Sequence, residues 1–254
     1  EIMPSLVGSE MCIRDRGDKA TGKTDKNGEV TVPEVEKTEH HSAYVVGYTD
    51  GTFGPERNMT RSEAAAIFAR LLADKNGDNI SPVAKTKFSD VPAYAWYSGY
   101  VKYLNNNGVT YGHSKTIFAP DEQITRAEFT TMAVRFFDVY GDGDAEIMEQ
   151  FKSFDDVSDG YWAAEYIKAA AKHGWITGYG DGSFRADRQI TRAEVVTIVN
   201  RLLGREADLD YVSDNLRKLN TFPDVSRRYW AYSDILEAAN THNAILGTEE
   251  SWYK

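Results

Sequence analysis

The chain of 254 residues is long enough for one or two domains with a buried core, and its formal net charge is −10 at pH 7. This acidic balance argues against nucleic acid as a partner, because phosphate binding needs a basic field. The single cysteine, Cys12, excludes an internal disulfide and a cysteine metal cage, and the five histidines show no metal-ligand spacing. No apolar run approaches the ~20 residues of a membrane-spanning helix. We expect no metal, no cofactor and no insertion into a membrane.

Residues 1–43 differ in character from everything that follows them. The segment 4–16 resembles a translated adapter artefact, and we set it apart from the fold. Residues 17–39 are rich in Lys, Glu, Thr and Gly and contain one short alternating run, which is typical of a linker or of the end of an upstream β domain. Since the chain begins with Glu1 and no signal peptide follows, we expect an export signal farther upstream.

From Tyr44 onward the sequence repeats itself. The tetrad Thr-Arg-x-Glu occurs three times, and its arginines lie 65 and 66 residues apart. These tetrad arginines are Arg61, Arg126 and Arg192. A glycine precedes each of them by 14 residues, at Gly47, Gly112 and Gly178. A phenylalanine precedes each by eight residues, at Phe53, Phe118 and Phe184.

A second motif, Phe-x-Asp-Val, alternates with the tetrad and begins at Phe88, Phe154 and Phe222. A tryptophan follows each of these phenylalanines by eight residues, at Trp96, Trp162 and Trp230. After each tryptophan, and again after each tetrad, apolar residues recur with helical spacing, which predicts two helices per repeat joined by a turn that contains Gly and Asp. We find no strand alternation of useful length in this region. The sequence therefore predicts an all-α fold.

The order Phe-x-Asp-Val, Trp, Gly-Tyr-x-Asp-Gly-x-Phe and Ile-Thr-Arg-Ala-Glu resembles that of S-layer-homology domains, from Tyr44 to the C-terminus. The resemblance implies a three-lobed all-α module on the outside of bacteria, which binds secondary cell-wall polymers that often carry pyruvylated N-acetylmannosamine. It also implies that the tetrad arginine lines the groove that receives the acidic sugar. Carried over onto this sequence, the candidate ligand-binding residues are Arg61, Arg126, Arg192, Gly47, Gly178, Asp50, Asp181, Trp96, Trp162 and Trp230.

The sequence departs from this pattern in two places. The first tetrad has Ser62 where the other two have alanine, which is a mild change. The turn of the second copy has Lys115 where the others have Asp50 and Asp181, and it lacks their second glycine. We expect this turn to differ in shape and its groove to differ in ligand preference.

The tetrad itself has the pattern of a capping box, which makes Thr60, Thr125 and Thr191 the N-caps of three helices. The arginine that follows faces the positive end of the helix dipole, which costs about 0.3–1 kcal/mol. A bound anion would remove the conflict, because free N–H groups attract it and a guanidinium grips a carboxylate through two hydrogen bonds. Alternatively, each arginine pairs with an Asp or Glu of a neighbouring repeat. The residues alone leave both readings open, and the family resemblance favours the ligand.

Other motif residues have structural explanations. The three tryptophans fit core packing better than a groove edge, and the aspartates of Phe-x-Asp-Val are expected to cap the turn that follows each motif. Two acidic clusters, at 74–78 and 142–146, lack the glycine and glutamate positions of an EF-hand calcium loop and are expected to be solvated.

The copies are out of phase with the ends of the chain. We assign 1–43 to the start and linker, 44–86 to a first half-repeat, 87–152 and 153–210 to the second and third repeats, and 211–254 to a terminal half-repeat. Each half exposes an apolar helix face that needs a partner. We expect the last half to pack on the first and to close a pseudo-threefold ring, with the helix around Trp230 lying beside helix 61–72.

Three functions remain for such a module. The first is non-covalent anchoring of a surface protein to an anionic wall polysaccharide at the bacterial cell surface. The second is an appendage of a surface glycoside hydrolase, and the third is a protein–protein scaffold of the S-layer. Hydrolysis needs two carboxylates about 5–10 Å apart across a sugar. The recurrent carboxylates are already assigned to caps, so we expect no enzyme activity.

Overall fold

The computed structural model describes residues 23–24, 30–31, 37–141, 153–246 and 250–253. The artefact-like segment 4–16 and the acidic residues of 142–146 therefore lie outside the described residues. The chain divides into two units, 1–36 and 37–254. In the first unit, strands β1 (Lys23–Thr24) and β2 (Val30–Thr31) form an antiparallel pair.

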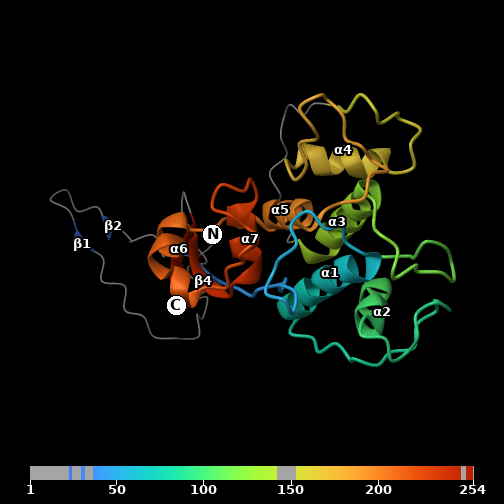
Figure 1. Cartoon of the computed structure of the whole chain (residues 1–254), viewed down its shortest axis with the longest axis horizontal. Coiled ribbons are helices and arrows are strands. Elements are labelled where there is room, and N and C mark those ends of the chain that lie inside the picture. The colour runs from blue at the N-terminus through green and yellow to red at the C-terminus, as the bar shows by residue number, and fades with distance from the viewer. Residues whose placement is uncertain (1–22, 25–29, 32–36, 142–152, 247–249, 254) are drawn as a thin grey trace, which may run out of the picture. The chain divides into compact units, whose positions relative to one another are not determined.

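The second unit is mainly helical, as the sequence predicts (Figure 1). Its helices are α1 (Arg61–Asn76), α2 (Ser98–Asn106), α3 (Arg126–Tyr140), α4 (Ala164–Lys172), α5 (Arg192–Leu203), α6 (Leu209–Asn215) and α7 (Tyr232–Ala239), with a 3-10 turn η1 (Leu216–Lys218) after α6. Strands β3 (Lys37–His41), β4 (His242–Leu246) and β5 (Glu250–Tyr253) form an antiparallel sheet in the order β3-β4-β5. The end of the segment assigned to a linker or to an upstream β domain lies in β3, and the C-terminal region contains two strands that the sequence did not predict.

The tetrads start the three long helices α1, α3 and α5 as predicted. In each helix the N-cap threonine side chain accepts from the N3 amide, and the N3 glutamate accepts from the threonine amide. The three helices pack in sequence, α1 on α3 and α3 on α5. Phe68 of α1 stacks on Phe129 of α3 with ring centroids 5.3 Å apart, in a core where both side chains are fully buried. These helices form the centre of the unit.

Each of the shorter helices α2, α4 and α7 packs on the tetrad helix that precedes it in the sequence. Helix α2 packs on α1, α4 on α3, and α7 on α5 (Figure 1). In each pair the apolar faces of the two helices meet, for example through Ile167 and Ala170 of α4. The expectation that α7 lies beside α1 is therefore wrong. The apolar face of α7 finds its partner in the tetrad helix directly before it, as α2 and α4 do.

The ring nevertheless closes, through the turns. Backbone hydrogen bonds form a three-membered cycle in which the amide of Met59 donates to Ile190, that of Ile190 to Ile124, and that of Ile124 to Met59. These three residues directly precede the N-caps and are almost fully buried. Each central helix therefore begins at the same pseudo-threefold junction.

The aspartates of Phe-x-Asp-Val hold turns far away in the sequence. Asp90 accepts from the amides of Phe118 and Ala119, and Asp156 does the same for the turn of the third copy. The terminal motif performs this role for the first turn, because Asp224 accepts from the amides of Phe53 and Gly54 at 2.9 and 2.7 Å. Asp90 and Asp156 thus cap the Gly-containing turn that follows in their own repeat, whereas Asp224 caps the first turn of the array, far before it in the sequence. The C-terminal half-repeat completes the N-terminal one through this bond.

Candidate functional site

Three grooves occur at equivalent places in the three repeats, with volumes of about 470, 330 and 200 Å³. We name them grooves A, B and C. Each combines the turn of one repeat, the tetrad glutamate and helix of the same repeat, the tetrad arginine of the preceding one and the tryptophan of the next. Groove A is lined by Arg61, Gly112, His113, Glu128, Arg135 and Trp162. Groove B is lined by Arg126, Gly178, Tyr179, Glu194, Arg201 and Trp230. Groove C is lined by Arg192, Gly47, Tyr48, Glu63, Arg70 and Trp96.

The tetrad arginines lie at the bottom of the grooves and are buried, with exposed fractions of 4–6%. Arg61 donates from Nε to the carbonyl of Phe118 at 2.8 Å and from Nη1 to Glu128 Oε1 at 2.7 Å. Arg126 repeats both contacts one copy later, with Phe184 and Glu194. Each of these two arginines therefore pairs with the glutamate of the neighbouring repeat. This ion pair is the alternative to a bound anion that the sequence leaves open.

Arg192 closes the cycle with a different partner. Its Nε donates to the carbonyl of Phe53 at 2.9 Å, and its Nη2 donates to the carbonyl of Val46 at 2.9 Å. A peptide carbonyl thus takes the place that a carboxylate holds in grooves A and B. Burial lowers the pKa of this guanidinium, an effect that Tyr48 and the Glu63 charge oppose.

The helix N-termini do not offer free amides to an anion, contrary to the premise of the sequence argument. The amides of Arg61 and Ser62 donate to the carbonyls of Glu122 and Pro120 in the next repeat. The first two amides of α3 and α5 are satisfied in the same way by neighbouring turns. The positive helix ends therefore stabilise the junction between repeats.

The tryptophans are exposed, so the prediction of core packing is wrong. Trp96, Trp162 and Trp230 have exposed fractions of 55%, 57% and 58%. Each lies two residues ahead of its helix, and the residue that follows it points into the core instead. Those buried neighbours are Tyr97, Ala163 and Ala231. The indoles instead form one wall of each groove.

Of the remaining candidate ligand-binding residues, the two glycines line grooves and the two aspartates do not. Gly47 and Gly178 line grooves C and B, where a side chain would collide with Phe222 or Phe154. Asp50 and Asp181 are not among the residues that line grooves A to C. Each aspartate accepts hydrogen bonds within its own exposed turn, Asp50 from Thr52 and Asp181 from Ser183.

A second arginine in each groove escaped the sequence analysis. Arg70, Arg135 and Arg201 each lie nine residues after the tetrad arginine, on the side of the central helix that faces the groove. Arg70 and Arg135 lie over the rings of Tyr100 and Tyr166, 5.1 and 4.9 Å from the ring centroids. In the described part of the chain none of the three has an ion-pair partner. The constant nine-residue spacing is a signal that could have revealed them.

Grooves B and C have a tyrosine where groove A has His113. In groove B, Tyr179 donates to Glu194 Oε1 at 2.8 Å and lies beneath the Arg126 guanidinium. Burial and this hydrogen bond raise the pKa of Tyr179. In groove A, His113 Nδ1 lies 4.0 Å from Glu128 Oε1. Groove A, which has the largest volume of the three, therefore also differs from the other two in its polar lining.

The turn bordering groove A also differs in shape, as predicted. All three turns share one bond, from the amide after the glycine to the carbonyl four residues later. In the first and third turns a glycine amide then donates back, from Gly51 to Tyr48 and from Gly182 to Tyr179. Both glycines have positive φ. The second turn lacks such a glycine, and Ser114 donates to the carbonyl of Ile117 instead.

The S-layer homology domain family matches residues 34–65, 87–130 and 153–196 of this chain. Two relatives come from Acetivibrio thermocellus: cell surface glycoprotein 1, 37% identical over 217 residues, and the cellulosome-anchoring protein, 36% identical over 226 residues. These matches cover 83% and 87% of this chain but only 9% and 47% of the relatives. A third relative, exoglucanase XynX of the same species, is 31% identical over 166 residues, which are 65% of this chain and 15% of the enzyme.

The chain belongs to the S-layer homology family and carries three tandem copies of its domain. Its place is the bacterial cell surface, where this family and these relatives are found. The chain spans less than half the length of the two relatives named first. Among the described residues, none of the helices combines the length and apolarity that a membrane crossing requires.

Proposed function

We propose that the chain is a non-catalytic anchor that holds its parent protein to the cell wall by binding an anionic secondary polysaccharide in grooves A to C. The ligand is a sugar that carries a carboxylate, such as a pyruvylated amino sugar. One observation carries this proposal: each groove places a second arginine, which has no ion-pair partner among the described residues, opposite an exposed tryptophan. A guanidinium binds a carboxylate through two hydrogen bonds, and an indole face covers the apolar side of a sugar ring.

Within this proposal the two arginines of a groove have different roles. The outer one, such as the exposed Arg70 of groove C, meets the ligand carboxylate directly. The buried one, such as Arg61, already makes two hydrogen bonds that hold the groove together. Its positive charge still offsets Glu128 at the bottom of the groove. A ligand that reaches the groove floor would share Arg61 with that glutamate.

Two other functions remain as alternatives. Exoglucanase XynX shares similar repeats, which supports an appendage role for them beside a catalytic domain. In that case the module still anchors, and the enzyme is a different part of the parent protein. A protein scaffold differs in its prediction, because it would bind other S-layer proteins and have no need for a wall polysaccharide.

The test replaces the outer groove arginines, of which two are exposed and Arg135 is half-buried, rather than the buried tetrad arginines. Breaking a buried ion pair costs about 3–5 kcal/mol, so a loss of binding by Arg61→Ala or Arg126→Ala would not separate recognition from folding. The triple variant Arg70→Ala, Arg135→Ala and Arg201→Ala removes charges at the groove surface instead. Since a hydrogen bond to a charged group contributes about 1.5–3 kcal/mol, we expect each groove to bind roughly 10- to 100-fold more weakly. Sedimentation with purified sacculi and calorimetry with a pyruvylated disaccharide measure this loss.

A matched control carries Lys102→Ala, Lys168→Ala and Arg217→Ala, three exposed cations outside grooves A to C. It changes the net charge equally and is expected to bind sacculi as the wild type does. Both triple variants are expected to melt at the wild-type temperature. Undiminished binding by the groove variant would refute the proposal, and binding that survives extraction of the wall polymer would favour the scaffold.

A further inference from the structure

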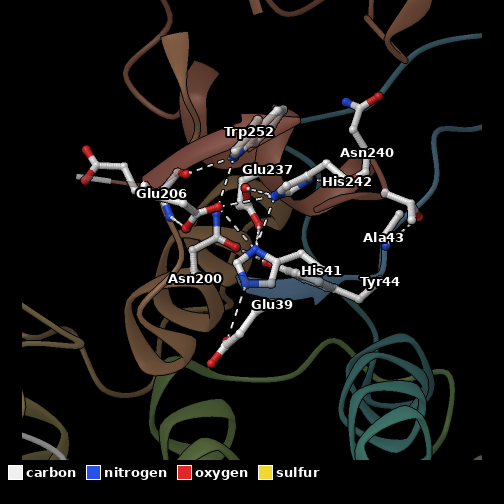
Figure 2. A network of polar contacts seen from close by, with 12 residues as sticks. Glu39, His41, Ala43, Tyr44, Asn200, Glu206, Glu237, Asn240, His242 and Trp252 are labelled. Carbon is white, nitrogen blue, oxygen red and sulfur yellow. Dashed lines mark hydrogen bonds and ion pairs between the residues drawn. The ribbon is translucent and has the colours of Figure 1, made fainter. Parts of the chain in front are cut away.

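Two histidines and two glutamates converge where the beginning of the second unit meets its end. His41 closes strand β3, Glu237 lies on α7, His242 opens β4 and Glu250 opens β5. One ligand atom from each lies within 4.8 Å of all the others. His41 and His242 are register partners in the β3-β4 ladder although 201 residues separate them. Figure 2 shows the side chains of His41, Glu237 and His242 directed toward a common point.

The distances within this cluster match the edges of a metal-ligand tetrahedron. His41 Nδ1 lies 3.2 Å from His242 Nε2, and both nitrogens lie 3.2 Å from Glu250 Oε1. The oxygens of Glu237 lie 3.4 Å from His41 Nδ1 and 3.3 Å from His242 Nε2. Zinc binds nitrogen and oxygen ligands at about 2.0–2.2 Å, so a tetrahedral site separates its ligand atoms by about 3.3–3.5 Å.

The Glu237 carboxylate supplies an independent observation. Its side chain has an exposed fraction of 0%, and neither of its oxygens has a hydrogen-bond partner among the described residues. A buried carboxylate without such partners is costly. Both oxygens nevertheless face the two histidine nitrogens. A cation between the four groups would compensate this buried charge.

The surrounding residues orient the ligands as in known metal sites. His242 Nδ1 lies 3.0 Å from the carbonyl of Asn240, so a neutral ring that donates this bond directs the lone pair of Nε2 at the cluster. His41 turns its other nitrogen, Nε2, toward a carboxylate oxygen of Glu39 at 3.7 Å. The second oxygen of Glu250 accepts from the amide of Glu206 at 2.9 Å. Such outer contacts fix the tautomer and the ring orientation of metal-bound histidines.

We propose that His41, Glu237, His242 and Glu250 bind one zinc ion as a structural site that ties the entry strand β3 to α7 and the C-terminal hairpin β4-β5. Four protein ligands leave no position open for a substrate, which is typical of structural zinc. Two imidazoles favour zinc over calcium or magnesium, which prefer oxygen ligands throughout. The histidines escaped the sequence analysis because their spacing carries no metal motif. Only strand pairing brings them together.

A proton is the competing occupant of the cluster. Burial by itself lowers the pKa of His41, but the neighbouring carboxylates of Glu237 and Glu250 raise it to about 9. A protonated His41 between two carboxylates would stabilise the same fold without metal. The two arrangements predict different responses to added zinc. The metal site binds zinc stoichiometrically, whereas the cluster held by a proton gains no stability from zinc.

The experiment uses the full chain without a histidine tag, stripped of metal by a chelator. Calorimetric titration with zinc chloride is expected to give one site per chain, and a saturating excess is expected to raise the melting temperature by about 5 °C or more. Calcium and magnesium chloride are expected to do neither. Cobalt in the same site is expected to show the strong visible absorption of a tetrahedral complex. If the wild-type chain does not bind zinc one to one, the proposal is wrong whatever the variants show.

Substitutions then locate the ion. His41→Ala and Glu237→Gln are expected to lose zinc binding and the zinc-dependent rise in melting temperature. The matched control is His40→Ala, which removes an exposed neighbour on the same strand that bonds only Asn243 among the described side chains. It is expected to bind zinc as the wild type does. Equal zinc binding by His41→Ala and His40→Ala would place the ion elsewhere and refute the assignment. Because sacculus binding uses grooves A to C, it is expected to survive in His40→Ala with or without zinc.

Discussion

At the scale of single residues, the tetrad glutamate does more than cap a helix. Glu194 accepts the Thr191 amide with Oε2 at 2.9 Å, and its Oε1 accepts from Arg126 and Arg188 at 3.1 and 2.8 Å. Burial works against the ionised form, but the Thr191 amide and the Arg126 charge outweigh it and lower the pKa of Glu194. The Glu194 side chain therefore contributes to the start of α5, to the junction between two repeats and to the lining of groove B.

The lowered pKa predicts an acid-sensitive contribution to stability. A carboxyl whose folded pKa lies below its ordinary value, near 4.5, stabilises the fold above that value, and the contribution is lost as the pH falls through the folded pKa. Glu194→Gln can still cap α5, since glutamine also serves at N3. We expect it to cost about 2–3 kcal/mol at neutral pH, and the difference from wild type to shrink below pH 4.5. Urea unfolding across pH 3–7 measures this, with exposed Glu165→Gln as the control. A difference that stays constant with pH would contradict the mechanism.

At the residue scale, some features follow from the sequence and others do not. The capping boxes follow from local spacing alone, and they are present in all three repeats. The partners of Arg61 and Arg126 could not be chosen from spacing, because Glu128 and Glu194 lie 67 and 68 residues away. The tryptophans were misplaced for a more local reason. Each tryptophan lies two residues before its helix begins, and the residue after it is buried in its place, while the indole faces outward.

At the scale of elements, the turns are held by close packing against the motif phenylalanines. Gly178 has φ 68°, and a Cβ there would lie 2.4 Å from Phe154 Cε1 and 2.8 Å from the carbonyl of Ser183. The same contact recurs at Gly47 with Phe222 and at Gly112 with Phe88. The glycine that precedes each tetrad is therefore required by the approach of a distant ring.

Gly178→Ala is expected to destabilise the protein by about 2–5 kcal/mol. The left-handed backbone costs an alanine about 1–2 kcal/mol, and overpacking against Phe154 adds about 1–3 kcal/mol. Gly180→Ala is the matched control, since a Cβ at this neighbouring position of the turn would have nothing within 4 Å. We expect it to be close to neutral. Thermal unfolding of both variants measures the difference, and equal melting temperatures would show that the turn yields to the methyl group.

The elements that sequence reasoning missed are those that depend on distant partners. Strands β4 and β5 are five and four residues long, which is too short to show alternation. They form because β3, at the start of the second unit, pairs with β4, near its end. Helix α7 was recognised from its apolar spacing, but its partner was not. Periodicity shows that a face needs covering and does not say which helix covers it.

At the scale of the whole unit, the C-terminal segment completes two parts of the fold at once. Helix α7 covers α5, while Phe222 and Asp224 hold the first turn, with the rings of Phe222 and Phe53 5.3 Å apart. The amides of Tyr44 and Val45 donate to the carbonyl of Ala238 as well. The middle hairpins α1-α2 and α3-α4 have their partners within 61–172.

Truncation before Phe222 is therefore expected to loosen both ends of the repeat array and to spare its middle. Without residues 222–254, the apolar face of α5 and the turn 44–57 lose their partners, so their amides should exchange rapidly with solvent. The amides of α3 should keep most of their protection, because α1 and α4 remain packed on that helix. Hydrogen exchange read by mass spectrometry measures this pattern, and a chain that lacks only residues 1–36 serves as the control, since that segment forms a separate unit. Uniform loss of protection across α1, α3 and α5 would show instead that the ring folds as one indivisible unit.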